Sequence, residues 1–202
     1  MARYPIPAEI HRTKEEIERS RFITTVAPAA TVDDAQRFVQ AMRDEFPDAT
    51  HNCWAYVVGP PGSTTRVGMS DDGEPHGTAG RPMLTALLHG GVGDVAAVVT
   101  RYFGGVKLGT GGLVRAYGGC LQRALLELPR AEHVAWVTLQ ALVSYADLSA
   151  ARQLVASHGG TLVHEEYGAD VAYTVRLPAP DVDAFTTALR DATRGSAIVE
   201  RS

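Results

Sequence analysis

Two neighbouring stretches in the first two-thirds of the chain hold the residue types best suited to chemistry. Three carboxylates, Asp71, Asp72 and Glu74, lie within four residues of one another in the segment SDDGEPHGTAGR. Further along, Arg101 and Lys107 lie in the segment RYFGGVKLGTGG. Carboxylates can coordinate Mg²⁺, and basic side chains beside a helix N-terminus favour phosphate. The sequence thus offers an acidic turn and an anion-binding loop.

The glycine content of this region favours a binding surface. Fourteen of the twenty glycines lie between Gly68 and Gly119, and glycine lets a backbone approach a ligand closely. Thr110 opens a predicted helix, whose free N–H groups and positive dipole end attract anions. The predicted anion- or nucleic-acid-binding residues are Arg81, Arg101, Gly104, Gly105, Lys107, Thr110, Gly111, Gly112 and Arg115. The stretch matches neither the Walker nor the G-x-G-x-x-G spacing, which argues against ATP and NAD.

The acidic turn has two interpretations. Asp71, Asp72 and Glu74 could hold Mg²⁺, although a calcium loop needs a longer series of oxygen ligands. We favour a supporting role, in which these acids form a solvated turn or pair with Arg81 and Arg101 to hold the glycine loops. We therefore predict no metal, no cofactor and no catalytic residue. Assigning His51 or His76 to an acid–base site would require distances that a sequence does not contain.

Gly118 and Gly119 fall inside a predicted helix, where each costs about 1 kcal/mol relative to alanine. Either close packing against the sheet or a partner lying on the helix would account for them. Tyr102 and Phe103, beside Arg101, are typical of a base-stacking platform, although adjacent strand residues point to opposite faces.

Composition and charge exclude several classes of protein. The 202 residues are 45% hydrophobic and 21% charged, with a net charge of −4. This balance is typical of a globular protein and argues against one coated in positive charge for non-specific nucleic-acid binding. The charge is uneven, because five basic residues between positions 95 and 130 accompany a single acid, Glu127. An anion site is therefore expected in the N-terminal domain.

The first twenty residues and the cysteines bear on location. The charged run between Lys14 and Arg19 lies where a signal peptide would need its apolar region. No segment is apolar enough to span a bilayer. Cys53 and Cys120 cannot form a disulfide framework and suit reduced, buried thiols. We expect a cytoplasmic protein.

Periodicity and turn signals predict an α+β protein with domains at residues 1–132 and 133–202. In the first domain, strands at 21–27, 52–58, 65–69 and 95–99 are combined with helices that begin after Thr31, at Pro82 and near Thr110. The apolar run 95–99 is predicted to be the central strand. In the second domain, strands and helices between 135 and 199 follow the order βαββαβ, which is ferredoxin-like.

Three blocks of sequence closely resemble the YigZ/IMPACT family: THNCWAYVVG (50–59), SDDGEPHGTAGRPML (70–84) and VVTRYFGGVKLGTGGLVRAYGG (98–119). The resemblance implies an N-terminal domain like the second domain of a small-subunit ribosomal protein and of RNase PH, with a left-handed crossover against the usual rule. It also implies a C-terminal domain resembling the last domain of elongation factor G. His76 departs from the family pattern, in which a small residue, usually serine, is expected.

These observations favour a binding protein linked to translation or its regulation, rather than an enzyme. It would contact RNA or a ribosome-associated partner through the glycine-rich surface. One alternative is a metal-dependent enzyme acting on a phosphorylated or nucleotide substrate, with Mg²⁺ on the acidic turn and phosphate on Lys107 and Thr110. Another is a protein-interaction module that uses the C-terminal domain. No membrane partner is expected, and the oligomeric state stays open.

Overall fold

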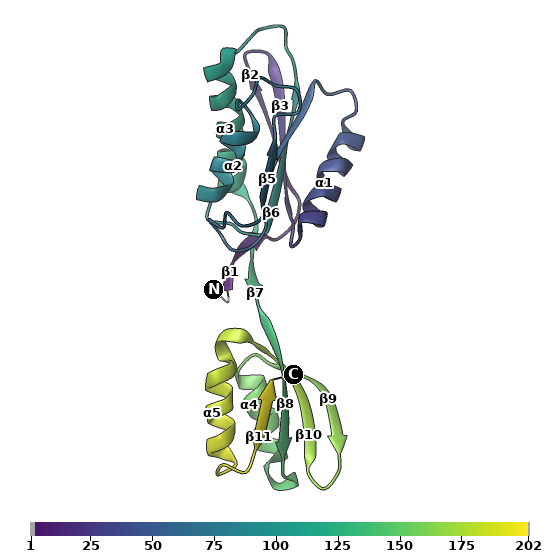
Figure 1. Ribbon diagram of the computed structural model, residues 1–202, viewed down its shortest axis with the longest axis vertical. Coiled ribbons are helices and arrows are strands. Elements are labelled where there is room, and N and C mark those ends of the chain that lie inside the picture. Colours follow the sequence, from purple (N-terminus) through teal and green to yellow (C-terminus); the bar gives the residue numbers. More distant parts are fainter. Residues whose placement is uncertain (1–2, 202) are drawn as a thin grey trace. The chain divides into compact units, whose positions relative to one another are not determined.

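The computed structural model describes residues 3–201, and these form two compact units. The N-terminal unit covers Arg3–His133, and the C-terminal unit begins at Val134. Both units combine helices with β-sheets, so the α+β class predicted from the sequence is confirmed (Figure 1).

A five-stranded antiparallel sheet forms the centre of the N-terminal unit. Its strands are β2 (His11–Ile17), β3 (Ser20–Pro28), β4 (His51–Val57), β5 (Val67–Ser70) and β6 (Val95–Tyr102), in the order β2-β3-β6-β4-β5. Strand β6 is central, as its apolar run predicted, because residues buried on both faces need covering on both sides.

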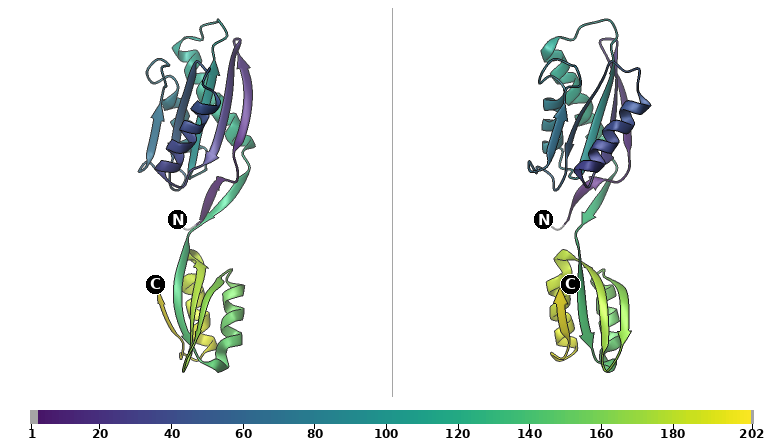
Figure 2. Two further views of the ribbon diagram at one scale, coloured as in Figure 1. Left: turned by 90° about the vertical axis from the view of Figure 1, so that its right-hand side faces the viewer. Right: turned by 45° about the vertical axis from the view of Figure 1, so that its right-hand side comes forward.

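Helices cover both faces of this sheet, as Figures 1 and 2 show. Helix α1 (Val32–Glu45) lies on one face, and α2 (Gly80–His89) and α3 (Gly109–Glu127) lie on the other. Alternate residues of β6 serve the two cores: Val99 packs with Met83 and Tyr117, while Val98 packs with the residues of α1. Strand alternation gives β6 apolar side chains on both faces, and α2 and α3 share the core on one of them.

Three strands of the N-terminal unit differ from the sequence prediction. Strand β2 includes part of the charged run, for which no strand or helix was predicted. A strand can form there because its charged side chains lie at a sheet edge where water reaches them. Strands β1 (Arg3–Pro7) and β7 (Arg130–Val134) pair with each other in a separate two-stranded sheet. The Tyr4 ring stacks on His133, and its hydroxyl donates to Asp94 at 2.6 Å. This contact secures β1, and periodicity in so short a segment gave no sign of it.

The C-terminal unit has the predicted βαββαβ order. It contains β8 (Trp136–Val143), α4 (Leu148–Ser157), β9 (Thr161–Tyr167), β10 (Val171–Pro178), α5 (Val182–Ala192) and β11 (Ile198–Arg201), with short 3-10 turns at Tyr145–Asp147 and Ala179–Asp181. The sheet order is β11-β8-β10-β9. Leu139 of β8 and Val175 of β10 share a core with Val155 of α4 and Phe185 of α5. Both helices therefore pack on one face of this sheet. No helix within residues 3–201 has the length and apolarity needed to cross a membrane.

Helix α1 begins with a capping box. The Thr31 hydroxyl accepts a hydrogen bond from the Asp34 backbone N–H at 3.0 Å, and the Asp34 carboxylate accepts one from the Thr31 backbone N–H at 2.9 Å. These bonds satisfy N–H groups that have no partner inside the helix.

Thr31→Ala should lower the free energy of unfolding of the N-terminal unit by about 1 kcal/mol, because it removes this cap. Urea unfolding can be followed by Trp54 fluorescence in a Trp136→Phe background, which removes the signal of the other tryptophan. Thr65→Ala, at an exposed loop position, is the control. An equal effect in both variants would show that the cap does not stabilise α1.

Candidate functional site

Asp71 caps helix α2 across the turn that precedes it. One carboxylate oxygen accepts the backbone N–H of Gly77 at 2.7 Å, and the other accepts those of Ala79 at 3.0 Å and Gly80 at 2.8 Å. Burial alone would raise the pKa of Asp71, but these three donors, with a smaller contribution from His76, hold it below its usual value. A Cβ at Gly80 would lie 2.9 Å from the Ser70 backbone, so only glycine fits where the helix begins.

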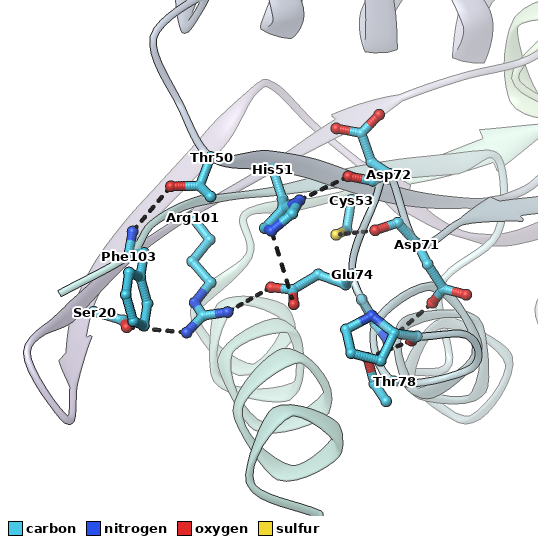
Figure 3. A network of polar contacts seen from close by, with 12 residues as sticks. Ser20, Thr50, His51, Cys53, Asp71, Asp72, Glu74, Thr78, Arg101 and Phe103 are labelled. Atoms are coloured by element: carbon cyan, nitrogen blue, oxygen red, sulfur yellow. Dashed lines mark hydrogen bonds and ion pairs between the residues drawn. The ribbon is translucent and has the colours of Figure 1, made fainter. Parts of the chain in front are cut away.

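Asp72 ties the same turn to α1 and β4. Its carboxylate accepts hydrogen bonds from Arg43 at 2.8 Å and from the Asn52 backbone N–H at 2.7 Å. The Nδ1 atom of His51 lies 2.8 Å from the Asp72 carbonyl oxygen, so Nδ1 carries the proton and donates. Asp72 has a φ of 44°, a left-handed conformation that aspartate tolerates better than most residues. Figure 3 shows the contact between His51 and the Asp72 carbonyl oxygen.

Glu74 and Arg101 form a buried ion pair below the turn (Figure 3). Their side chains are only 4% and 6% exposed, and Arg101 Nη1 lies 2.7 Å from Glu74 Oε1. The Tyr117 hydroxyl donates to the same oxygen at 2.7 Å, and Arg101 Nη2 donates to Ser20 at 3.1 Å. Burial raises the pKa of Tyr117, with Cys53 and Glu74 acting in the same direction, so the hydroxyl keeps its proton. Through these bonds the turn is joined to β6, α3 and β3.

The three acids are therefore engaged in separate structural contacts. Asp71 faces the start of α2, Asp72 faces Arg43, and Glu74 points into the core. Within residues 3–201, no group of three or more His, Cys, Asp or Glu side chains is arranged to hold a metal ion. The Mg²⁺ set of the alternative interpretation is not formed, because its carboxylates do not converge. The predicted pairing with Arg101 is confirmed for Glu74, whereas Arg81 forms no ion pair with these acids.

Arg101, one of the predicted anion-binding residues, is buried in the structure. Its guanidinium group is buried on Glu74 and lies 5.5 Å from the centres of the Phe22 and Phe103 rings. A phosphate cannot reach it without breaking the ion pair. Three of the predicted cations remain exposed, namely Arg81, Lys107 and Arg115. Within residues 3–201, their side chains form no ion pair or hydrogen bond.

The predicted glycines divide into two groups. Gly104 serves packing, because a Cβ there would lie 1.8 Å from the Arg19 carbonyl oxygen. Gly105 has a φ of 85° with open space around it, so it shapes a turn without crowding. Thr110, Gly111 and Gly112 form the first turn of α3, where no side chain caps the helix. The N–H groups of Thr110 and Gly111 have no acceptor inside the helix and are left for water or a ligand.

A groove runs between α2 and α3 on the face that carries these cations. We call it the α2/α3 groove; its residues are Gly77, Arg81, Pro82, Thr85, Val114, Arg115, Gly118, Gly119 and Gln122, and its volume is about 460 Å³. A second hollow of about 440 Å³, at the start of α3, is lined by Lys107 and Gly112 and shares Arg115 with the groove. A third, of about 360 Å³, shares Gln122 and is lined by His89 and Arg130. Cationic side chains therefore line a series of hollows along α3.

Sequence reasoning named Arg81 of α2 as a binding residue but missed the contributions of Pro82, Thr85 and Gln122 to this groove. The Gly118-Gly119 pair was the available signal, since both residues lie in the groove. Of the two aromatic residues, Phe103 is 48% exposed, whereas the Tyr102 hydroxyl donates to Asp48. His76 is fully exposed, with Nδ1 3.7 Å from Asp71, so a residue larger than serine is accommodated without crowding.

Comparison with known proteins assigns both units. The Impact N-terminal domain family matches residues 18–125, and a domain of unknown function, DUF1949, matches residues 142–196. The IMPACT family member YigZ of Escherichia coli (strain K12) is 43% identical over 196 residues, which are 97% of this chain and 96% of that protein. A Thermus thermophilus IMPACT family member is 40% identical over 185 residues, covering 91% and 99% of the two chains.

A solved structure agrees with this assignment. The crystal structure of a hypothetical protein is 43% identical, with a TM-score of 0.71 over 98% of this chain and 97% of that chain. The fold and site thus define a two-unit α+β protein with a buried ion pair below an acidic turn and a cationic groove. The chain belongs to the IMPACT family, as its sequence blocks indicated.

Glu74→Gln should lower the free energy of unfolding of the N-terminal unit by about 3 kcal/mol or more, because it leaves the Arg101 charge buried without a counter-charge. Urea unfolding followed by Trp54 fluorescence measures this loss. Glu45→Gln, in the partly exposed pair with Arg12 of the same unit, is the matched control and should change stability little. A loss below about 1 kcal/mol for Glu74→Gln would show that the buried pair is not a principal constraint.

Asp71→Asn should destabilise the N-terminal unit most at neutral pH, with a deficit that shrinks in acid. The native pKa of Asp71 is depressed, so its stabilisation is present above the pKa of the unfolded state and is lost as pH falls through the native pKa. Urea unfolding of both proteins across a pH series tests this. Asp170→Asn, in the C-terminal hairpin, is the control. A deficit independent of pH would show that the Asp71 charge does not act through the cap.

Proposed function

We propose that this protein binds RNA, or an RNA-bearing ribosomal partner, through the α2/α3 groove and the first turn of α3, and that it acts in translation or its regulation without being an enzyme. The carrying observation is a set of three exposed cations, Arg81, Lys107 and Arg115, whose side chains form no ion pair within residues 3–201. One acid, Glu18, lines the same hollow as Lys107. Nucleic acid presents a row of phosphates, and phosphate contacts supply much of the affinity of such complexes.

Two further cations near the same surface differ from these three. Arg123 pairs with Glu15, and Arg101 pairs with Glu74, so each of these charges has a structural partner. Arg81 and Arg115 instead flank one groove from two helices, with Lys107 in the adjoining hollow. The nearby N-terminus of α3 adds uncapped N–H groups that favour an anion.

The predicted fold relationships belong to the same proposal. An N-terminal unit like the second domain of a small-subunit ribosomal protein and of RNase PH, and a C-terminal unit like the last domain of elongation factor G, would both fit work on RNA or the ribosome. Such fold analogies carry less weight than the site itself. A cytoplasmic location and a domain boundary near residue 132 complete the proposal.

A protein-interaction role for the C-terminal unit is the second candidate. Its uncovered sheet face carries apolar side chains that are partly exposed, including Trp136, Leu142 and Ile198 at 41%, 37% and 56%. Strand pairing places Ile198 opposite Leu142, so the two side chains are neighbours. Thr138→Glu and Leu142→Glu would disrupt such a contact while leaving RNA affinity unchanged.

Lys107→Glu/Arg115→Glu should lower affinity for a labelled single-stranded RNA by at least about tenfold and reduce the slope of log affinity against log salt by about 2. Fluorescence anisotropy across a salt series measures both quantities. Each reversed residue removes one phosphate contact and adds repulsion, which accounts for the direction.

The control is Arg190→Glu/Arg194→Glu, which changes the net charge equally at exposed positions of the C-terminal unit. Equal weakening in the two double variants would assign binding to overall charge. Unchanged affinity of Lys107→Glu/Arg115→Glu would overturn the proposed function.

A further inference from the structure

The α2/α3 groove has a glycine floor that packing does not require. Gly118 has an ordinary helical conformation, and a Cβ added there would lie 3.5 Å from Pro82 Cβ, an ordinary van der Waals distance. At Gly119 the first contact would be Arg123 Nη1 at 3.2 Å, the movable end of a long side chain. Alanine would therefore fit at both positions and would favour the helix. Of the two explanations that the sequence allowed, close packing loses its support.

What the glycines provide is depth between two cations. Because glycine has no side chain, positions 118 and 119 leave the groove open. Its volume of about 460 Å³ is within the range of small-ligand sites. Arg81 and Arg115 line it from opposite helices, so an anion bound by either would hold an attached group over the glycines. Pro82 and the 40% exposed Val114 add apolar surface to the groove. Such a surface does not bind a phosphate, but a flat aromatic ring can pack on it.

Gln122 completes the chemistry of the groove. Its side chain is exposed and, within residues 3–201, forms no hydrogen bond. An amide offers both a donor and an acceptor, the combination that pairs with the edge of a nucleobase. The groove thus combines phosphate-binding cations, an apolar floor and a hydrogen-bonding amide.

Resting on the proposed function, we infer that the groove takes one unpaired nucleobase of a single-stranded RNA, with the flanking phosphates on Arg81 and Arg115 and the base edge at Gln122. In duplex RNA the bases are stacked and paired, so none can enter the hollow. The surface therefore selects single-stranded RNA over duplex RNA, a choice that phosphate contacts alone would not make.

The test is a graded filling of the groove. Gly118→Ala and Gly118→Leu are titrated against a labelled oligoadenylate and against an RNA duplex of the same length, and thermal unfolding of each variant is recorded. Affinity for the single strand should fall about tenfold for Gly118→Leu, and less for Gly118→Ala, because the added side chain occupies the space of the base. Duplex affinity should change less than about twofold, since the cations remain. Ser149→Leu, at an exposed position of α4, is the control for an added apolar side chain.

The stability readout separates binding from packing. Gly118→Ala should not lower the melting temperature, because the methyl group fits and alanine favours the helix. If Gly118→Leu fails to fold, the alanine variant and Gln122→Leu, which removes the amide, carry the same comparison.

Each outcome bears on a different claim. Unchanged single-strand affinity in the glycine variants, together with weakening in Lys107→Glu/Arg115→Glu, overturns the base-binding inference and keeps the proposed function. Equal weakening toward single strand and duplex overturns the selectivity. Failure of both variant sets to change RNA affinity overturns the proposed function as well.

Discussion

The buried pair of Glu74 and Arg101 is the constraint on which the N-terminal unit depends. An isolated charge in this position would be unstable, so the two side chains fix each other and everything attached to them. Glu74 brings the acidic turn down onto the sheet, and its second donor, Tyr117, brings α3 to the same point. Asp71, three residues earlier, then has the geometry to cap α2. One ion pair thereby sets the positions of both helices that form the groove.

The acids and cations of this unit have separate roles. The carboxylates of the turn stabilise the fold, because each accepts hydrogen bonds from a backbone N–H group or a buried side chain. The exposed cations Arg81, Lys107 and Arg115 are left without an acidic partner among residues 3–201. A protein with a net charge of −4 can in this way present a locally positive groove. A preformed phosphate-binding surface requires both features, namely a turn held in place by its carboxylates and exposed cations without an acidic partner.

Sequence reasoning succeeded where a residue's role follows from its neighbours in the chain. The apolar run of β6, the cap at Thr31 and the βαββαβ order are local patterns, and all three are confirmed. It failed where the partner is distant in sequence. Arg101 has the same residue type as Arg115, yet Glu74 makes one structural and leaves the other exposed. Strand β2 was missed because charged residues at a sheet edge have no apolar signature, and the groove was missed because α2 and α3 meet only in the fold.

RNA bound in the groove between α2 and α3 would lie against Gly118 and Gly119. Titrating single-stranded RNA into isotope-labelled protein and following backbone amide resonances by NMR tests this placement directly, since Gly118, Gly119 and Gly111 report from separate parts of the surface. We expect shifts that concentrate on Gly118, Gly119 and the first turn of α3, while the resonances of the C-terminal sheet around Leu142 stay unchanged. Shifts confined to the C-terminal unit, or none in the groove at saturating RNA, would contradict this placement.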